Sequence, residues 1–316
     1  MIKKEFYFLS CDQKTKIHVL AWLPQQPPRG ILQICHGMTE HIERYHAFAS
    51  FLCEQGYLVV GHDHLGHGAS VQTEEDRGYF HKTQGNAILI RDIRRLFLKV
   101  RKHFPHTPYY MLGHSMGSFL LRQYLQVYGP DTTVEGLSGA ILMGTGNLPA
   151  SVLLPAICLC KGVMLLKGER HRSVFLNNLA FGSYNRRFRP VQTDYDWLSR
   201  DANQVAAYAA DPWCTFIFTA NAYYHMFCGM LTLCSKKQRQ RIPKDLPLLL
   251  VSGEADPVGN CGKGVRQVAQ QYKKAGIQSV SLKLYPNDRH EILNELDKAS
   301  VYHDILDWLN RTTCIV

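Results

Sequence analysis

Residues 109–118 have the sequence YYMLGHSMGS, and this stretch sets the expected fold. Residues 109–112 are apolar and aromatic, which is the composition of a buried strand. Residues 113–117 fit the pattern G-x-S-x-G, and residues 118–127 predict a helix rich in apolar side chains. A strand, a sharp turn and a helix in this order are the setting in which the pattern holds a serine hydroxyl above the edge of a sheet.

The glycines of the motif support the same interpretation. A turn tight enough to lift the Ser115 hydroxyl strains the backbone and brings strand and helix together, so a Cβ at Gly113 or Gly117 would clash. We therefore assign Gly113, His114 and Gly117 as supports of a candidate nucleophile, Ser115. Because G-x-S-x-G also occurs by chance in unrelated chains, the rest of the sequence is needed to decide whether Ser115 is a nucleophile.

The composition is that of a globular protein with a basic surface. The chain has 316 residues, of which 46% are hydrophobic and 20% charged, a length that suits one large domain with an insertion or two domains. The formal net charge of +10 favours anionic partners. Because the Lys/Arg clusters are short, we expect no nucleic-acid binding.

The sequence predicts a soluble, cytoplasmic protein. The N-terminal residues lack the apolar core of a signal peptide, and the most apolar stretch, 151–166, contains Pro155 and Lys161 and is too short to span a bilayer. No C-x-x-C pair is present, so the cysteines are expected to be reduced thiols. They are Cys11, Cys35, Cys53, Cys158, Cys160, Cys214, Cys228, Cys234, Cys261 and Cys314.

Strand and helix patterns alternate along most of the chain. A hairpin is expected first, and the later alternation predicts an α/β fold with a mostly parallel central sheet and helices on both faces. Strands are predicted over 5–9, 16–23, 31–35, 58–60, 109–112, 139–143, 246–251 and 280–284. Helices are predicted over 42–55, 85–104, 118–127, 264–275 and 298–309.

The alternation stops between residues 147 and 242. We interpret this segment as a helical cap, or lid, inserted into a core formed by residues 1–146 and 243–316. Basic residues outnumber acidic ones in the cap, so it could make transient contact with an anionic membrane surface, but we expect its apolar first helix to pack on the core. The expected cap helices cover 151–166, 195–210 and 220–234.

Candidate catalytic residues fall at the carboxyl ends of the predicted parallel strands, where sites of such sheets lie. A serine needs a base, and the base needs an orienting acid, in the chain order Ser, Asp or Glu, His. Asp256 follows one strand after Ser115, with Glu254 as the alternative acid. His290 follows the next strand, whereas His303 lies inside the last predicted helix. The predicted triad is therefore Ser115, Asp256 and His290.

The tetrahedral intermediate of such a reaction needs two preorganised N–H donors. One is expected from the backbone of Met116, directly after the nucleophile, and the other from Met38, in the loop that begins with His36 and Gly37. Residues 62–67, HDHLGH, do not have the order of a known metal-hydrolase motif, so we expect a structural turn and no metal there.

The combined motifs resemble the monoacylglycerol lipase and lysophospholipase branch of the α/β-hydrolase superfamily. The resemblance covers about residues 16–146 and 243–296, while the cap matches only in place and rough size. Ser118 departs from the family pattern, in which many relatives have glycine after the pentapeptide. We expect this difference to alter how the substrate fits more than it alters catalysis. The motifs are His36-Gly37-Met38-x-Glu40-His41, Arg44-Tyr45, Asp63-His64-x-Gly66-His67-Gly68-x-Ser70 and Gly113-His114-Ser115-Met116-Gly117.

The resemblance implies an α/β-hydrolase fold and a cofactor-independent serine carboxylester hydrolase, with the triad and oxyanion residues already assigned. The expected substrates are small amphiphilic esters with one acyl chain, monoacylglycerol or lysophospholipid. An aminopeptidase, a thioesterase or a C–C bond hydrolase could use the same triad, and a non-catalytic binding protein is the alternative outside enzymes. Acyl length, head group and oligomeric state are left open by the sequence.

Overall fold

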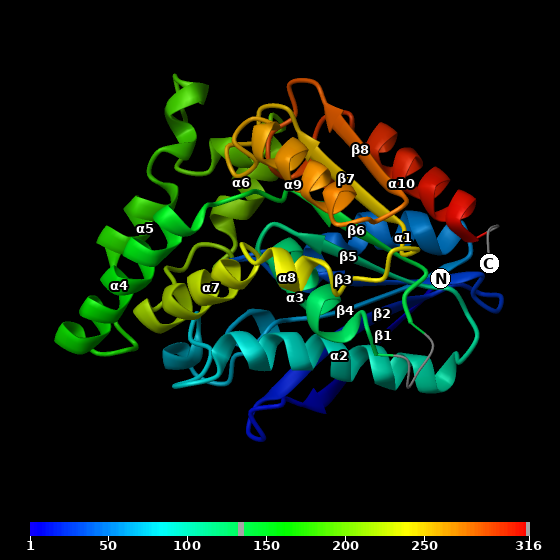
Figure 1. Cartoon of the computed structure of the whole chain (residues 1–316), viewed down its shortest axis with the longest axis horizontal. Helices are drawn as coiled ribbons and strands as arrows, with labels where there is room; N and C mark the ends of the chain where they lie inside the picture. The colour runs from blue at the N-terminus through cyan, green and yellow to red at the C-terminus, as the bar shows by residue number, and fades with distance from the viewer. Residues whose placement is uncertain (132–135, 314–316) are drawn as a thin grey trace.

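The computed structural model describes residues 1–131 and 136–313. Its centre is an eight-stranded sheet in the order β1-β2-β4-β3-β5-β6-β7-β8 (Figure 1). β1 and β2 form the predicted hairpin, β2 also pairs antiparallel with β4, and the remaining neighbours are parallel. The strands are β1 Ile2–Leu9, β2 Lys16–Leu23, β3 Gly30–Cys35, β4 Tyr57–His62, β5 Tyr109–His114, β6 Gly139–Met143, β7 Leu248–Gly253 and β8 Val280–Tyr285.

The central strands are continuous apolar runs because both of their faces are covered. Every residue of β3, β4, β5, β6 and β7 is buried, whereas the edge strand β8 alternates between exposed and covered positions. A parallel strand buried on two faces has no polar side to alternate with. This pattern confirms the predicted mostly parallel sheet.

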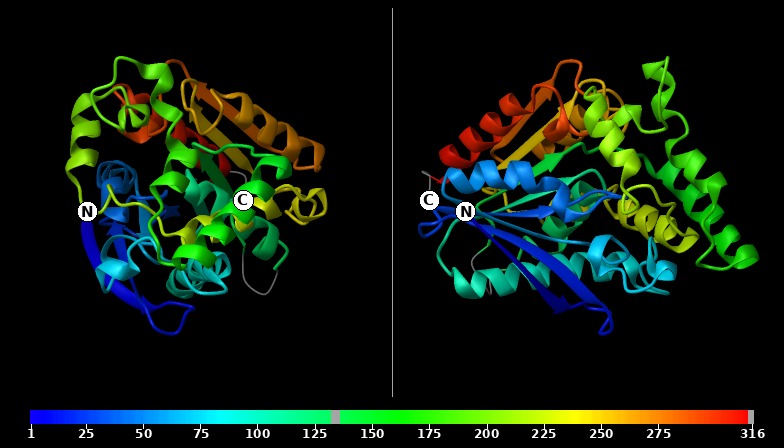
Figure 2. Two further views of the ribbon diagram at one scale, coloured as in Figure 1. Left: turned by 90° about the vertical axis from the view of Figure 1, so that its left-hand side faces the viewer. Right: turned by 180° about the vertical axis from the view of Figure 1, so that it is seen from behind.

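Two hydrophobic cores lie on the two faces of the sheet. Buried residues of α1 and α10 belong to one core, and those of α2, α3 and α9 belong to the other (Figure 2). These helices lie close to their predicted positions and confirm the α/β architecture. They are α1 His46–Glu54, preceded by the 3-10 turn η1 Ile42–Tyr45, and α2 Gly85–His103, α3 Met116–Tyr128, α9 Lys263–Lys274 and α10 Lys298–Thr313.

The segment between β6 and β7 is helical, and it differs from the prediction in three places. The helix expected over 195–210 begins only at Ala202, because the Asp201 carboxylate caps it by accepting from the Asn203 N–H. Two further helices, which we did not predict, start after the N-caps Ser173 and Ser235. The helices are α4 Ala150–Lys167, α5 Val174–Phe181, α6 Ala202–Ala210, α7 Ala220–Thr232 and α8 Lys236–Arg239.

The first helix of this segment bears on two expectations. We expected its apolar face to pack on the core; Cys160 belongs to the larger core, and Leu159, Val163 and Met164 pack against it, but of the 18 residues of α4 only Leu153 and Cys160 are buried. α4 packs against α7 and lies at the end of the molecule far from both termini, so its outer side is uncovered (Figures 1 and 2). Leu165 and Leu166 are 81% and 87% exposed. By length and composition α4 is also apolar enough to cross a membrane, contrary to the expectation that this stretch is too short.

The cysteines that the structure describes are free thiols, as predicted, and Cys314 lies outside the described residues.

Candidate active site

Ser115 stands at the sharp turn between β5 and α3. Its backbone has φ 51° and ψ −118°, and its N–H donates to the carbonyl oxygen of Met143 at 3.0 Å. A Cβ on Gly117 would lie 2.0 Å from the Cys35 carbonyl oxygen, and one on Gly113 would lie 2.4 Å from the Gly117 carbonyl oxygen. Both glycines are therefore required by close backbone approach, as the sequence predicted, and the strained φ of Ser115 is held in place by the surrounding elements.

The predicted acid and base lie in contact. The Asp256 carboxylate, in the loop after β7, is 3.0 Å from the His290 Nδ1, in the loop after β8. The same carboxylate accepts from the Val258 N–H at 2.8 Å and from the Ser252 hydroxyl at 3.1 Å. An acid fixed in this way orients the imidazole so that its Nε2 can serve as the base. Glu254, the alternative acid, is exposed and lies 3.6 Å from Arg266.

Ser115 and His290 line one cavity of about 430 Å³. A second cavity of about 750 Å³ is lined by Ser115 and by both predicted oxyanion residues, Met38 and Met116. The fold thus brings together side chains from four separate strand ends, and the assignment of their catalytic roles stays a prediction.

A buried carboxylate, Glu40, holds the loop after β3 against the nucleophile turn. Glu40 accepts from the Tyr45 hydroxyl at 2.9 Å and from the Gly37 N–H, and it lies 2.9 Å from the His114 Nδ1. Burial would raise the pKa of Glu40, but the charges of His114 and Arg44 outweigh burial and lower this pKa to about 2. Burial would lower the pKa of His114, yet Glu40 raises it. Glu40 therefore connects the oxyanion loop to the residue before Ser115.

Arg44 extends this network to the loop of His290. Its guanidinium binds both carboxylate oxygens of Glu291, at 2.6 and 2.7 Å, and Glu291 directly follows His290. The charge of Arg44 outweighs burial and lowers the pKa of Glu291. Glu40 and Arg44 appear in the sequence motifs, but nothing in the spacing indicates that Glu291 is their partner.

The two cavities beside Ser115 differ in polarity. The larger is mainly apolar, and its lining includes Phe119, Leu153, Leu159, Met226, Phe227 and Met230. The smaller carries amide, hydroxyl and carboxylate groups and, among the described residues, no Lys or Arg; its lining includes Thr39, Asn177, Asn178, Asn185, Asp194 and Tyr195. Much of both linings comes from the cap, whose packing the sequence pattern does not specify.

The run 62–67 forms the buried turn that the sequence predicted beside the site. The His64 N–H donates to the His36 Nε2 at 2.9 Å, and the rings of His62 and His64 lie 4.8 Å apart. Burial lowers the pKa of His62 and of His67 to about 4, so these imidazoles are neutral in the folded protein at pH 7.

Ser118 does not lie where an effect on substrate fit would require it. Its hydroxyl donates to the Ser115 carbonyl oxygen at 2.6 Å, and it is absent from the lining of the two cavities beside Ser115. This position inside α3 makes Ser118 part of the support beneath the turn.

Known proteins are similar over nearly the whole chain. The family model described as serine aminopeptidase, S33, matches residues 26–297. A monoacylglycerol lipase from Mycolicibacterium smegmatis is 29% identical over 293 residues, which cover 91% of this chain and 90% of that protein. The monoglyceride lipase of Homo sapiens is 27% identical over 301 residues, which cover 92% of this chain and 86% of that protein.

A solved structure agrees at the level of the fold. The crystal structure of a highly thermostable carboxyl esterase from Bacillus coagulans has a TM-score of 0.90 and 29% identity, with 99% of both chains covered. Because the family model spans far more than half of the residues, the chain belongs to the α/β-hydrolase family described as serine aminopeptidase, S33, and it is a hydrolase.

Proposed function

We propose that this protein is a serine hydrolase that cleaves carboxylic esters of single-chain acyl lipids. The Ser115 hydroxyl attacks the ester carbonyl while the His290 Nε2 takes its proton, and Asp256 holds the imidazole in the required tautomer. The alcohol leaves with a proton from His290, and a water activated by the same imidazole then releases the fatty acid. The backbone N–H groups of Met38 and Met116 stabilise the oxyanion in both steps.

The observation that carries this proposal is the position of Ser115 between the larger, mainly apolar cavity and the smaller one, which we call the polar cavity for the amide, hydroxyl and carboxylate groups that stand among its apolar side chains. The apolar cavity of about 750 Å³ is suited to an alkyl chain, and the polar cavity of about 430 Å³ is suited to the leaving alcohol. When the ester carbonyl lies over Ser115, the acyl chain can therefore occupy the apolar cavity and the alcohol can occupy the polar one.

The charges of the polar cavity favour a neutral head group. Glu40 and Glu291 line it but are ion-paired to Arg44, whereas Asp194 has no such partner, and a phosphate would meet this carboxylate without a Lys or Arg among the described lining residues. Glycerol hydroxyls can instead bond to the asparagine and tyrosine side chains. We therefore favour monoacylglycerol over lysophospholipid, and the names of the relatives agree with this choice.

An aminopeptidase is the second candidate. The matching family model carries that description, and Asp194 gives the polar cavity a carboxylate that could bind the ammonium of an N-terminal residue. The apolar cavity is the argument for a lipid, because a terminal amino acid would leave much of its volume unfilled.

A substrate panel separates these functions. We suggest comparing six substrate classes at one enzyme concentration, with Ser115→Ala as the control. They are monoacylglycerols, lysophospholipids, p-nitrophenyl esters, acyl thioesters, diketones with a cleavable C–C bond and aminoacyl amides. We expect the highest kcat/KM for a monoacylglycerol and loss of all activity in Ser115→Ala. A higher kcat/KM for aminoacyl amides would favour the peptidase. Failure of a fluorophosphonate to label the wild-type protein would point to a non-catalytic binding protein.

We further propose that the enzyme meets its substrate at an anionic lipid surface. The exposed apolar side chains of α4 and α5, among them Leu165, Leu166 and Phe175, lie close in sequence to the cations Lys167 and Arg170. Apolar side chains flanked by cations are the composition of segments that insert into the headgroup region of anionic membranes. The cytoplasmic location remains a prediction beside this proposal.

A further inference from the structure

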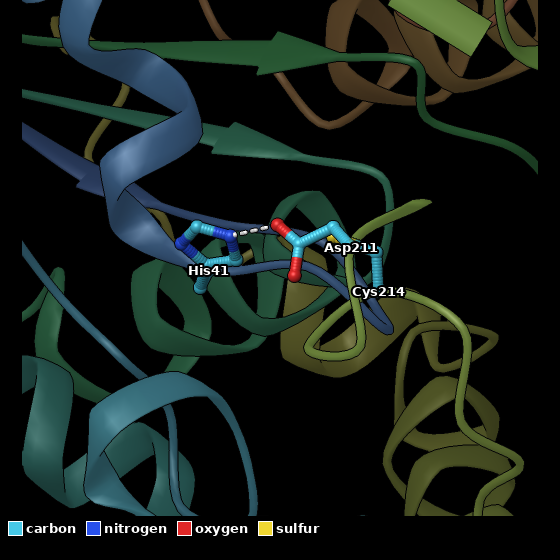
Figure 3. A group of neighbouring side chains, drawn as sticks. All are labelled: His41, Asp211 and Cys214. Atoms are coloured by element: carbon cyan, nitrogen blue, oxygen red, sulfur yellow. Dashed lines mark hydrogen bonds and ion pairs between the residues drawn. The ribbon is translucent and has the colours of Figure 1, made fainter. Parts of the chain in front are cut away.

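Two groups of side chains outside the predicted triad carry donor atoms of the kind that bind metal ions. In one, Asp288, Glu295 and Asp297 surround the guanidinium of Arg200, which is ion-paired to all three carboxylates. The guanidinium already occupies the place between the carboxylates that an ion would take, so we infer no metal site there. The other group is His41, Asp211 and Cys214 (Figure 3), and among the described residues no Lys or Arg is ion-paired to its carboxylate.

The second group has the geometry of a three-residue metal site. One nitrogen of His41, one carboxylate oxygen of Asp211 and the Cys214 sulfur all lie within 4.8 Å of one another. The His41 Nε2 is 2.8 Å from the Asp211 Oδ2, and Asp211 is held from its other oxygen by the Trp213 N–H at 2.8 Å. In tetrahedral zinc sites each donor lies about 2.0–2.3 Å from the ion, which places the donors roughly 3–4 Å from one another. The 2.8 Å pair would have to open slightly, and a pair near the 4.8 Å limit would have to close by about 1 Å.

The charges also suit a divalent cation. A thiolate, a carboxylate and a neutral imidazole together balance a 2+ ion, so the buried complex would have no net charge. Cys214 also interacts electrostatically with Arg44, Glu40 and Glu291, and these three groups sum to one negative charge. Neither the bound complex nor its surroundings therefore oppose entry of the cation.

We propose that His41, Asp211 and Cys214 form a binding site for a borderline-soft divalent metal ion of the zinc class. The mixed nitrogen, oxygen and sulfur donor set selects such an ion over Mg²⁺ or Ca²⁺, which prefer oxygen ligands. Cys214 lines the polar cavity beside Ser115, so the ion can enter from this cavity and complete its coordination with a water molecule.

Binding exchanges protons for the ion. In the free protein the carboxylate of Asp211 accepts from the His41 imidazole and from the Cys214 thiol. On binding, the thiol proton leaves to solvent and the imidazole proton moves from Nε2 to Nδ1, so one proton is released per ion. Among the described residues the His41 Nδ1 has no hydrogen-bond partner. A ligand histidine without such a partner binds its metal about 10–100-fold more weakly, so we expect a regulatory rather than a permanent ion.

The ion would join two parts of the molecule at the candidate active site. His41 follows the loop of Met38, whereas Asp211 and Cys214 lie between the cap helices α6 and α7. The cap already contacts this loop there, because the Tyr208 hydroxyl donates to the Thr39 carbonyl oxygen at 2.8 Å. A metal bridge would therefore restrict movement of the cap relative to the predicted oxyanion loop.

Cobalt binding to the full-length protein tests the site without any activity measurement. Co²⁺ should be titrated into protein reduced with a non-thiol reductant while the near-ultraviolet thiolate-to-metal band and the visible bands of tetrahedral Co²⁺ are recorded. We expect one equivalent of Co²⁺ to bind, Zn²⁺ to displace it, and the apparent affinity to rise about tenfold per pH unit while the thiol is protonated.

Matched variants assign the signal to these residues. Cys214→Ser should lose the thiolate band, and Asp211→Asn, which keeps the shape of the side chain, should bind at least about tenfold more weakly. Cys158→Ser removes an exposed cysteine of α4 that lines neither cavity beside Ser115, and this variant should bind as the wild type does. Zn²⁺ should raise the Tm of the wild type and of Cys158→Ser but not of Cys214→Ser. A thiolate band that persists in Cys214→Ser, or no saturable Co²⁺ binding in the wild type, would overturn the proposal.

Discussion

At the scale of single residues, the nucleophile turn depends on the absence of side chains at its two ends. Gly117→Ala would place a Cβ 2.0 Å from the Cys35 carbonyl oxygen and 2.5 Å from that of His36. Both are backbone atoms that cannot rotate away, so we expect the free energy of unfolding to fall by about 3 kcal/mol, the upper part of the range for overpacking. Urea denaturation followed by circular dichroism measures this change.

Gly162→Ala is the matched control for that substitution. Gly162 lies inside α4, and nothing stands within 4 Å of the position of its Cβ. Alanine there should leave the free energy of unfolding unchanged or raise it by up to about 1 kcal/mol, because glycine is the poorer helix former. Equal destabilisation by the two substitutions would show that the close approach at Gly117 has no energetic effect.

The contact between Asp256 and His290 predicts that a substitution of Asp256 slows the reaction. Asp256→Asn keeps the shape of the side chain but favours the wrong imidazole tautomer, so we expect kcat to fall by about 10³–10⁴-fold with little change in KM. Glu254→Gln, in the same loop, should retain kcat within about twofold, since Glu254 points to Arg266. Hydrolysis of a soluble p-nitrophenyl ester measures both. A larger loss in Glu254→Gln would transfer the role of the acid to Glu254.

At the scale of elements, the loops after β3 and β4 meet in a cluster of buried imidazoles that predicts acid sensitivity. Burial lowers the pKa of His62 and His67 to about 4, whereas an unfolded histidine has a pKa of about 6.5. Between these values the unfolded chain binds protons that the folded protein does not. Each histidine should then reduce the free energy of unfolding by about 1.4 kcal/mol per pH unit as the pH falls from about 6.5 to 4. Urea denaturation at several pH values measures this slope.

His67→Phe tests whether the cluster causes the slope. The ring of His67 lies among Phe80, Phe216 and Phe218, with centroid distances of 5.3–6.1 Å, so a phenyl ring fits this environment. Unfolding of the variant should take up about one proton fewer, so the slope of its free energy of unfolding against pH should fall by about 1.4 kcal/mol per pH unit. An unchanged slope would mean that His67 takes up its proton in the folded state without cost.

The helix α4 carries the prediction that concerns membranes. Replacing Leu165 and Leu166 together with serine removes two of the most exposed apolar side chains of the cap, so vesicle binding should weaken at least about tenfold, at roughly 25 cal/mol per Å² of apolar surface. Leu98→Ser, on α2 and 41% exposed, should not change binding. Cosedimentation with anionic vesicles measures both variants. Hydrolysis of a soluble short-chain ester should be equal in all three proteins, because none of these leucines lines the two cavities beside Ser115.

Strands and helices could be predicted from the sequence where their own residues, and not contacts with distant segments, determine where they begin and end. The runs that became β5 and β6 are apolar because both sheet faces are covered, and Gly139–Met143 matches its predicted bounds. The cap was less predictable, because its helices depend on neighbours. The start of the expected helix 195–210 became a 3-10 turn, η5 Asp196–Leu198, whose backbone carbonyls accept from the N–H groups of His290 and Glu291.

At the scale of the whole molecule, the candidate site could be predicted because the topology of an α/β sheet gathers strand ends at one edge. Ser115 was chosen from its motif, and Asp256 and His290 were chosen from their order after the later strands. The partnership of Arg44 with Glu291, separated by 247 positions, and that of His41 with Asp211, separated by 170, could not be chosen in this way. Such contacts follow from how loops from distant strands and the cap meet in space, which no local pattern records.

The net charge of the molecule gives a final prediction that separates the two forces of the proposed membrane binding. With a formal charge of +10, the protein should be attracted to anionic vesicles over a distance set by the Debye length, about 10 Å at 0.1 M salt and 3 Å at 1 M. Each cation near the surface contributes about 1 kcal/mol, so the action of two or three of them predicts binding at least about tenfold weaker at 1 M than at 0.1 M salt. Binding to neutral vesicles should be weak and independent of salt, since only α4 and α5 contribute to it. Equal binding to both kinds of vesicle at every salt concentration would leave the apolar helices as the sole cause, and the basic charge of the cap would then need another partner.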